Sequence, residues 1–290
     1  MDGRDICAKT RFALLPGHDE NKTPPTPVES PLMDSIDSAS PAAATSAVPA
    51  RRPPGVWLFW GTALWGLLIF AAMFAGQMAV VAWFVLRREG PIDVAAAIHV
   101  VGGGLTISLS VISGLPAVLA ALWLAIRMSG TPFTDYLALR GTSWVNFLIG
   151  AAALGVLVLG WDTLSRATGR DIAPGFMADV LQSARADGAL WLLVIAFCVA
   201  APVSEELFAR GFLYRGWAES RLGVPGAIVL SSLAWTSLHL QYDWFFFGEV
   251  FCIGLWFGYV RYRSQSTWLT IVLHAMNNLA AVVQSFLLAG

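Results

Sequence analysis

The feature of this sequence that most restricts its fold is a series of long apolar runs, which begins at Val56 and continues to the end of the chain. Hydrophobic residues make up 57% of the 290 positions and charged residues 13%. Ordinary soluble domains carry about 25% charged residues. Several runs reach the ~20 residues that a helix needs to cross ~30 Å of hydrocarbon. The sequence therefore predicts an all-α, polytopic transmembrane helical bundle.

The simplest division of these runs gives about seven spans, within a range of six to eight. The predicted spans are residues 56–86, 95–126, 143–161, 188–220, 225–241, 244–260 and 267–289. The second contains Gly102-Gly103-Gly104 and Pro116, which predict a kink or a division into two segments.

Residues 1–54 differ from the rest because they are rich in Pro, Ala, Ser and Thr and hold no long apolar run. Such a segment cannot bury enough apolar surface to fold, so we expect a disordered tail before a transmembrane domain at 55–290. Cys7, Cys198 and Cys252 lack metal or redox spacing and are expected to be free thiols. A net charge of −1 and the absence of a basic face argue against a nucleic-acid partner.

The arginines predict the orientation in the membrane. Positively charged residues fall on alternate connections, at Arg51 and Arg52, Arg127 and Arg140, Arg215 and Arg221, and Arg261 and Arg263. The positive-inside rule places these connections and the N-terminus in the cytoplasm. Arg87-Arg88 and the arginines between 166 and 185 depart from this pattern, although acidic residues accompany them. We expect an integral protein of the plasma (cytoplasmic) membrane.

A charged group interrupts the fourth predicted span, at Glu205, Glu206 and Arg210. An ionised side chain near a bilayer centre costs at least about 2.5 kcal/mol, so such residues usually face an interior cavity and mark function. Glu206 and Arg210 stand one helical turn apart, in the favourable order for an ion pair. Glu205 lies about 100° around the helix from Glu206 and remains available for another task. A solvated, charged helix end is the alternative interpretation.

The turns between helices bring further polar residues to a similar depth. A hairpin at Gly223-Val224-Pro225 places His239 15 positions after Val224 and Glu206 18 positions before it. At 1.5 Å per residue, the two differ by about 4.5 Å along the helix axis. After the turn near Ser264, His274 and Asn278 lie one turn apart on one face. We therefore expect one polar layer inside the bundle. Glu249 also lies in an apolar helix, and its role is open.

These motifs resemble a known signature. Glu205-Glu206-x-x-x-Arg210, Trp235-x-x-x-His239 and His274-x-x-x-Asn278 are similar to the three motifs of the CPBP intramembrane proteases. That family includes CAAX prenyl endopeptidases and bacterial relatives linked to bacteriocin immunity. The resemblance covers residues 188–289, which we expect to be the protease-like core. The family usually has Phe where Trp235 stands, and we expect this difference to alter the cavity's shape more than its chemistry.

The resemblance implies an intramembrane endopeptidase that cuts a membrane-associated peptide or protein, with CAAX-type proteins among the options. In this reading Glu205 activates water with the help of His239, and Glu206 pairs with Arg210. His274 and Asn278 would hold the oxyanion. A zinc ion held by Glu205, His239 and His274 is a competing version, and family members are named metalloproteases. We prefer the metal-free version, since the chain lacks a His-Glu-x-x-His helix.

Two other classes of function remain open. A transporter would also bury Glu, Arg and His, but no inverted repeat is visible in the sequence. A non-catalytic bacteriocin-immunity or scaffold protein could keep the fold, although intact motifs count against it. The sequence does not indicate an oligomeric state.

Overall fold

The chain folds as a helical bundle, and no strand occurs in the residues that the structure describes. The structure is a computed structural model that describes residues 55–87, 89–90, 93–173 and 175–289. The predicted tail, residues 1–54, lies outside these ranges. The first half forms α1 (Phe59–Arg87), α2 (Val94–Gly102), α3 (Gly104–Ser129), α4 (Phe133–Tyr136), α5 (Trp144–Ala167) and α6 (Gly175–Ala186).

The second half begins with one long helix, which is continuous from Leu190 to Ala218. Its parts are α7 (Leu190–Ile195), η1 (Ala196–Ala200), α8 (Ala201–Glu206), η2 (Leu207–Leu213) and α9 (Tyr214–Ala218). It is followed by α10 (Gly223–Thr236), η3 (Ser237–His239), α11 (Trp244–Ser264) and α12 (Thr267–Ala289). We call the helix from Leu190 to Ala218 the central helix.

The composition of these helices confirms a membrane protein. Within the described part of the chain, 5 helices are long and apolar enough to cross a bilayer: α1, α3, α5, the central helix and α12. α10 has 14 residues and α11 has 21, and neither belongs to this group. Large apolar side chains on the outside of the bundle stay exposed, such as Trp60, Leu67 and Val156. Hydrocarbon would cover such a surface.

The predicted second span is divided in two, as the glycines indicated. α2 ends at Gly102 and α3 begins at Gly104, so the chain breaks at Gly103. Gly104 packs against the backbone of Ala184 in α6, where a Cβ atom would collide with it. Pro116 lies inside α3 without ending the helix. The missing side chain of Gly104 therefore lets α3 pack closely against α6.

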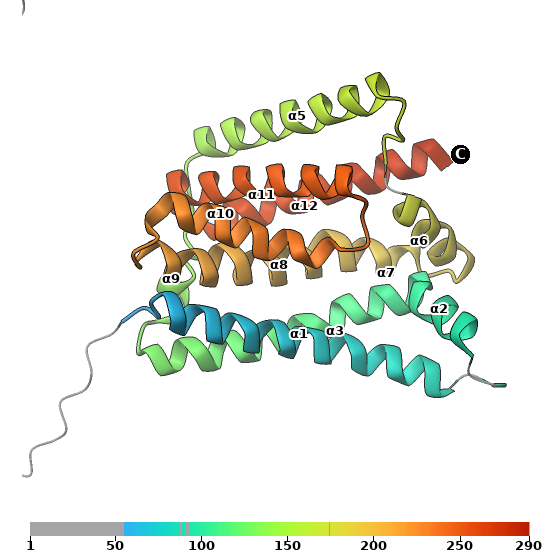
Figure 1. Cartoon of the computed structure of the whole chain (residues 1–290), viewed down its shortest axis with the longest axis horizontal. Helices are drawn as coiled ribbons and strands as arrows, with labels where there is room; N and C mark the ends of the chain where they lie inside the picture. Colours follow the sequence, from blue (N-terminus) through green and yellow to red (C-terminus); the bar gives the residue numbers. More distant parts are fainter. Residues whose placement is uncertain (1–54, 88, 91–92, 174, 290) are drawn as a thin grey trace, which may run out of the picture. The chain divides into compact units, whose positions relative to one another are not determined.

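The central helix is the most buried of the 5 apolar helices, with 56% of its most apolar window inside the bundle. It contacts α1 and α3 on one side and α10 and α12 on another (Figure 1). The predicted hairpin is present, because α9 and α10 pack together across residues 219–222. This burial holds the charged group of the central helix away from the bundle's surface.

Two stretches of the central helix, η1 and η2, are π-helical. In η1 the N–H of Ala201 bonds to the carbonyl of Ala196, five residues back. In this register the carbonyl of Phe197 would need an N–H from residue 202, which is a proline. Asn278 of α12 supplies the missing donor, with its Nδ2 2.8 Å from Phe197 O. π-helical turns are frequent at functional sites.

Candidate active site

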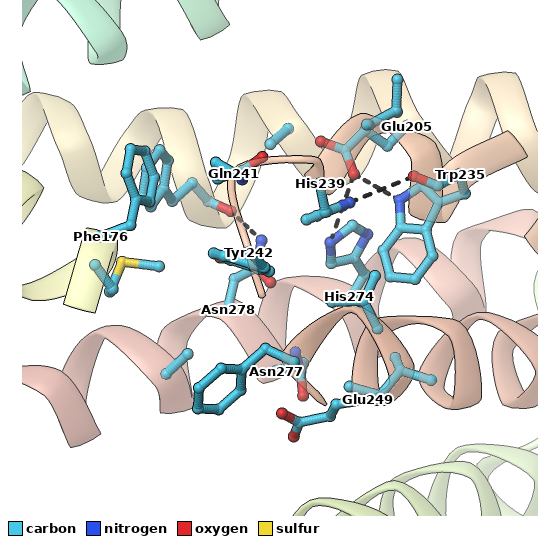
Figure 2. A pocket seen from close by; sticks show the side chains of 18 of the residues that line it. Phe176, Glu205, Trp235, His239, Gln241, Tyr242, Glu249, His274, Asn277 and Asn278 are labelled. Carbon is cyan, nitrogen blue, oxygen red and sulfur yellow. Dashed lines mark hydrogen bonds and ion pairs between the residues drawn. The ribbon is translucent and has the colours of Figure 1, made fainter. Parts of the chain in front are cut away.

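The predicted polar residues gather around one cavity of about 650 Å³. Side chains of α1, α3, α5, α6, α8, α10, η3, α11 and α12 contribute to its wall. Four of the six predicted site residues line it: Glu205, His239, His274 and Asn278. Figure 2 shows Glu205, Trp235, His239 and His274 facing one another. Glu206 and Arg210 lie behind them, since both are fully buried and neither lines the cavity.

Glu206 and Arg210 form the predicted ion pair, with Arg210 Nη1 2.8 Å from Glu206 Oε1. Arg210 Nη2 also donates to the carbonyl of Gly254 in α11 at 2.9 Å. The guanidinium lies 4.5 Å from the ring centroid of Trp235 and 5.5 Å from that of Phe257. A buried charge needs polar or aromatic partners that replace its contacts with water. Because these partners come from α10 and α11 as well, the ion pair joins the central helix to both.

His274 connects the two glutamates, a contact that the sequence did not predict. Its Nδ1 lies 3.1 Å from Glu206 Oε1, and its Nε2 lies 4.0 Å from Glu205 Oε2. A proton on Nδ1 satisfies the contact with Glu206 and fixes the plane of the ring. Nε2 then faces Glu205 and the cavity.

Glu205 has a different environment from its neighbour. Its side chain is 16% exposed, whereas that of Glu206 is 0% exposed. Trp235 Nε1 donates to Glu205 Oε2 at 2.6 Å. The carboxylate therefore remains within reach of the cavity, while Glu206 is enclosed by its partners.

His239 lies in η3, at the point where the chain leaves α10. Its Nδ1 is 3.3 Å from the carbonyl oxygen of Trp235, one turn earlier. The ring meets that of Trp235 edge to face, with 5.1 Å between centroids. Figure 2 shows the imidazole beside Glu205 and His274. The predicted polar layer is thus present, assembled from the central helix, η3 and α12.

The family assignment agrees with this geometry. Residues 187–280, which hold all six predicted site residues, match the family model described as type II CAAX prenyl endopeptidase Rce1-like. Over this third of the chain, the sequence is similar to the CPBP (CAAX protease) family, as its motifs predicted. This similarity supports a peptidase, and therefore a hydrolase. No curated protein and no solved structure matched the chain in the other two comparisons.

The CAAX protease match begins just before the central helix and ends inside α12. Helices α1 to α6 lie outside the matched residues, yet Met73, Gln77 and Ile107 of α1 and α3 line the same cavity. The first half of the chain therefore contributes to the shape of the site.

The candidate zinc ligands of the competing version, Glu205, His239 and His274, all line the cavity. Among the described residues, no three His, Cys, Asp or Glu side chains are arranged to hold a metal ion. One nitrogen of His274 faces Glu206, and one of His239 faces a backbone carbonyl. The other nitrogen of each ring is not used in these contacts, and His274 Nε2 faces Glu205 at 4.0 Å.

Several residues of the cavity were not predicted from the sequence. They are Gln241, Tyr242 and Asn277, together with Asp162, which accepts a hydrogen bond from Gln284 Nε2 at 2.9 Å. Glu249 also lines the cavity, as its position in an apolar helix had suggested. Burial, with the carboxylates of Glu205 and Glu249 nearby, raises the pKa of Tyr242 to about 12. The phenol of this connecting residue therefore keeps its proton at neutral pH.

Trp235 corrects an expectation about chemistry. Its indole was expected to change mainly the shape of the cavity, but its N–H bonds directly to Glu205. The sequence marked position 235 as unusual, because the family that it resembles usually has Phe there. It did not show in which direction the indole N–H would point.

Proposed function

We propose that this protein is an intramembrane endopeptidase in which Glu205 activates the attacking water. The observation that carries the proposal is the contrast between the two glutamates. Glu206 is enclosed and paired with Arg210, while Glu205 reaches the cavity beside two histidines. A general base needs access to water and an orienting partner, and Glu205 has both. Glu206 and Arg210 support the site from behind.

The reaction follows from these positions. Glu205 takes a proton from a water molecule while the water oxygen attacks the carbonyl carbon of the scissile bond. His274, oriented by Glu206, donates from Nε2 to the oxyanion when both its nitrogens carry protons. Asn278 has a second amide N–H, beyond the one that binds Phe197, for the same oxyanion. The C–N bond then breaks, and the proton passes from Glu205 to the leaving amine with His239 as the relay.

The substrate we propose is a membrane-associated protein or peptide, with prenylated CAAX-type chains as the first class to test. The family model that matches is described by this activity. The cavity also has extensive apolar walls, formed by residues such as Phe70, Phe74 and Val111. A lipid-modified peptide would place apolar atoms on such walls.

The decisive test is Glu205→Gln, which keeps the shape of the side chain but removes the base. The purified full chain in detergent would be assayed with a quenched fluorescent peptide that ends in a farnesylated CAAX sequence. Loss of a general base costs about 10²–10⁴-fold in rate, and we expect a loss in this range. Glu219→Gln, at the exposed C-cap of the same helix, is the control. Near-normal cleavage by Glu205→Gln would refute the assignment.

Comparing membrane proteomes of cells that carry wild type or Glu205→Gln tests substrates outside the CAAX class. A protein that accumulates uncut only in the variant identifies the substrate. If Glu205→Gln and His274→Ala both keep the full cellular function, the protein is a non-catalytic immunity or scaffold protein. Substrate-dependent uptake into vesicles would instead identify a transporter.

Elemental analysis tests the proposed metal-free mechanism. We expect cleavage to survive extensive treatment with a chelator and purified protein to contain no stoichiometric zinc. Stoichiometric zinc that leaves together with activity would replace this mechanism with a metal-dependent one.

A further inference from the structure

The indole of Trp235 occupies the centre of the site. The residue is 2% exposed. One face lies over Arg210, at 4.5 Å from its guanidinium carbon. The ring also meets His239 and His274 nearly edge to face, with centroids 5.1 and 5.3 Å apart. A ring held on several sides has little freedom to turn, so its N–H points in a fixed direction.

That direction is toward one oxygen of Glu205. Trp235 Nε1 lies 2.6 Å from Oε2, and the contact with His274 Nε2, at 4.0 Å, involves the same oxygen. Within the described residues, Glu205 thus uses Oε2 both for the hydrogen bond with Trp235 and for the ion-pair contact with His274. Oε1 is the oxygen left for a water molecule in the cavity.

Space for the indole is provided by a glycine of α11. A Cβ atom on Gly254 would lie 3.1 Å from Trp235 Cε3 and 3.4 Å from Arg210 Nη2. The carbonyl of the same glycine accepts the hydrogen bond from Arg210. Gly254 therefore leaves room for the indole, which an added Cβ atom would crowd, while its carbonyl holds the guanidinium.

We propose that Trp235 is a positioning residue, which holds Glu205 by Oε2 so that Oε1 faces the attacking water. The inference rests on the proposed function, since it concerns the same base. The CPBP proteases that this chain resembles usually have phenylalanine at this position. Its ring fills part of the space that the indole occupies but has no N–H. The carboxylate would then turn more freely about its terminal torsion. The hydrogen bond from Trp235 is therefore the contact that orients the Glu205 carboxylate in this chain.

Trp235→Phe tests this role, because it keeps an aromatic ring and removes only the donor and part of the ring. With the farnesylated CAAX peptide as probe, we expect kcat to fall about 10- to 100-fold, the range for a misaimed catalytic group. KM should stay unchanged, because the bond acts on the base and not on the bound substrate. Trp256→Phe is the matched control, since Trp256 Nε1 donates to Gly150 O at 3.1 Å away from the cavity.

A second measurement needs no substrate. The indole ¹H–¹⁵N resonance of Trp235 is assigned by its absence in Trp235→Phe, or in Trp235→Tyr if the first variant does not fold. In Glu205→Gln a neutral amide oxygen replaces the carboxylate oxygen, so the hydrogen bond weakens and the indole proton resonance should move upfield. The Trp256 resonance should stay in place.

The outcomes separate this inference from the proposed function. An unmoved Trp235 resonance in Glu205→Gln, or a Trp235→Phe variant that loses affinity but keeps kcat, would overturn the positioning role alone. Cleavage that persists in Glu205→Gln would overturn the proposed function, and the resonance would still report whether the bond exists. A fall in kcat together with a displaced resonance supports both.

Discussion

At the scale of single residues, two adjacent glutamates have different roles because their side chains leave the helix in different directions. Glu205 and Glu206 follow each other in sequence but point about 100° apart around the axis. One direction leads to the cavity, and the other leads to Arg210 and His274. The same functional group is therefore a candidate base in one case and a fixed support in the other.

Glu206→Gln tests the support role. The change leaves Arg210 fully buried without its countercharge, and breaking such a pair costs about 3–5 kcal/mol of stability. Glu219→Gln breaks a second pair with the same spacing, between Arg215 near the end of this helix and its C-cap residue, but its members are 45% and 29% exposed. An exposed pair contributes less than about 1 kcal/mol. Chemical unfolding of both variants in one detergent gives the comparison.

Equal losses in the two variants would contradict the assignment of Glu206 as a buried support. A large loss in Glu206→Gln alone, rescued in part when Arg210 is changed to Met, would show that the unpaired guanidinium is the cause.

At the scale of elements, the central helix combines tight packing with local irregularity. In η1 the Phe197 carbonyl accepts a hydrogen bond from Asn278, and this bond joins α12 to the helix that carries the glutamates. Near its other end, the helix approaches α1 at Gly216, where a Cβ atom would collide with Thr62 and with the carbonyl of Trp57. Small residues allow this kind of close approach between membrane helices.

Gly216→Ala should destabilise the protein by about 1–3 kcal/mol, because the added methyl group has no space in a packed contact. Gly155→Ala is the control, since nothing lies within 4 Å of the added atom on α5. There the change should be neutral or stabilise by up to about 1 kcal/mol, because alanine favours helix more than glycine does. Thermal unfolding in detergent measures both. Destabilisation by both variants to the same extent would show that the contact with α1 is unimportant.

At the scale of the whole bundle, arginines gather where the turns predicted as cytoplasmic meet. The connection after α4 bonds to the start of α12 through Arg140 O and Ser266 Oγ, and Arg215 Nη1 approaches Asp135 O. The start of α1 bonds to the end of α3 through Gly55 N and Ser129 O. These contacts bring the start of α1, the end of α3, α4, the end of the central helix and the start of α12 together (Figure 1). By the positive-inside rule, we propose that this end faces the cytoplasm.

Labelling of single cysteines tests this orientation. In a chain without its native cysteines, Arg263→Cys should react with a membrane-impermeant maleimide only when the cytoplasmic side is open. Asp187→Cys, on the connection between α6 and α7, should react from the opposite side. Both positions are exposed, so accessibility does not limit either reaction. The reverse pattern would show that the arginines beyond α5 and in α6 decide the orientation.

The sequence by itself determined the helical membrane fold, the division of the second predicted span, the hairpin at Gly223 and the pairing of Glu206 with Arg210. Each depends on hydropathy, on turn residues or on spacing within one helix, and these are local properties. It also indicated the layer that holds the glutamates and histidines, because distance from a turn sets depth along a helix.

Only the tertiary structure decided which atoms within that layer meet. The bond from Trp235 to Glu205, the bridge of His274 between two carboxylates and the contact of Asn278 with Phe197 each join different helices. They depend on the rotation of each helix about its axis and on side-chain rotamers, which the packing of all neighbours sets together. No spacing along one segment contains that information.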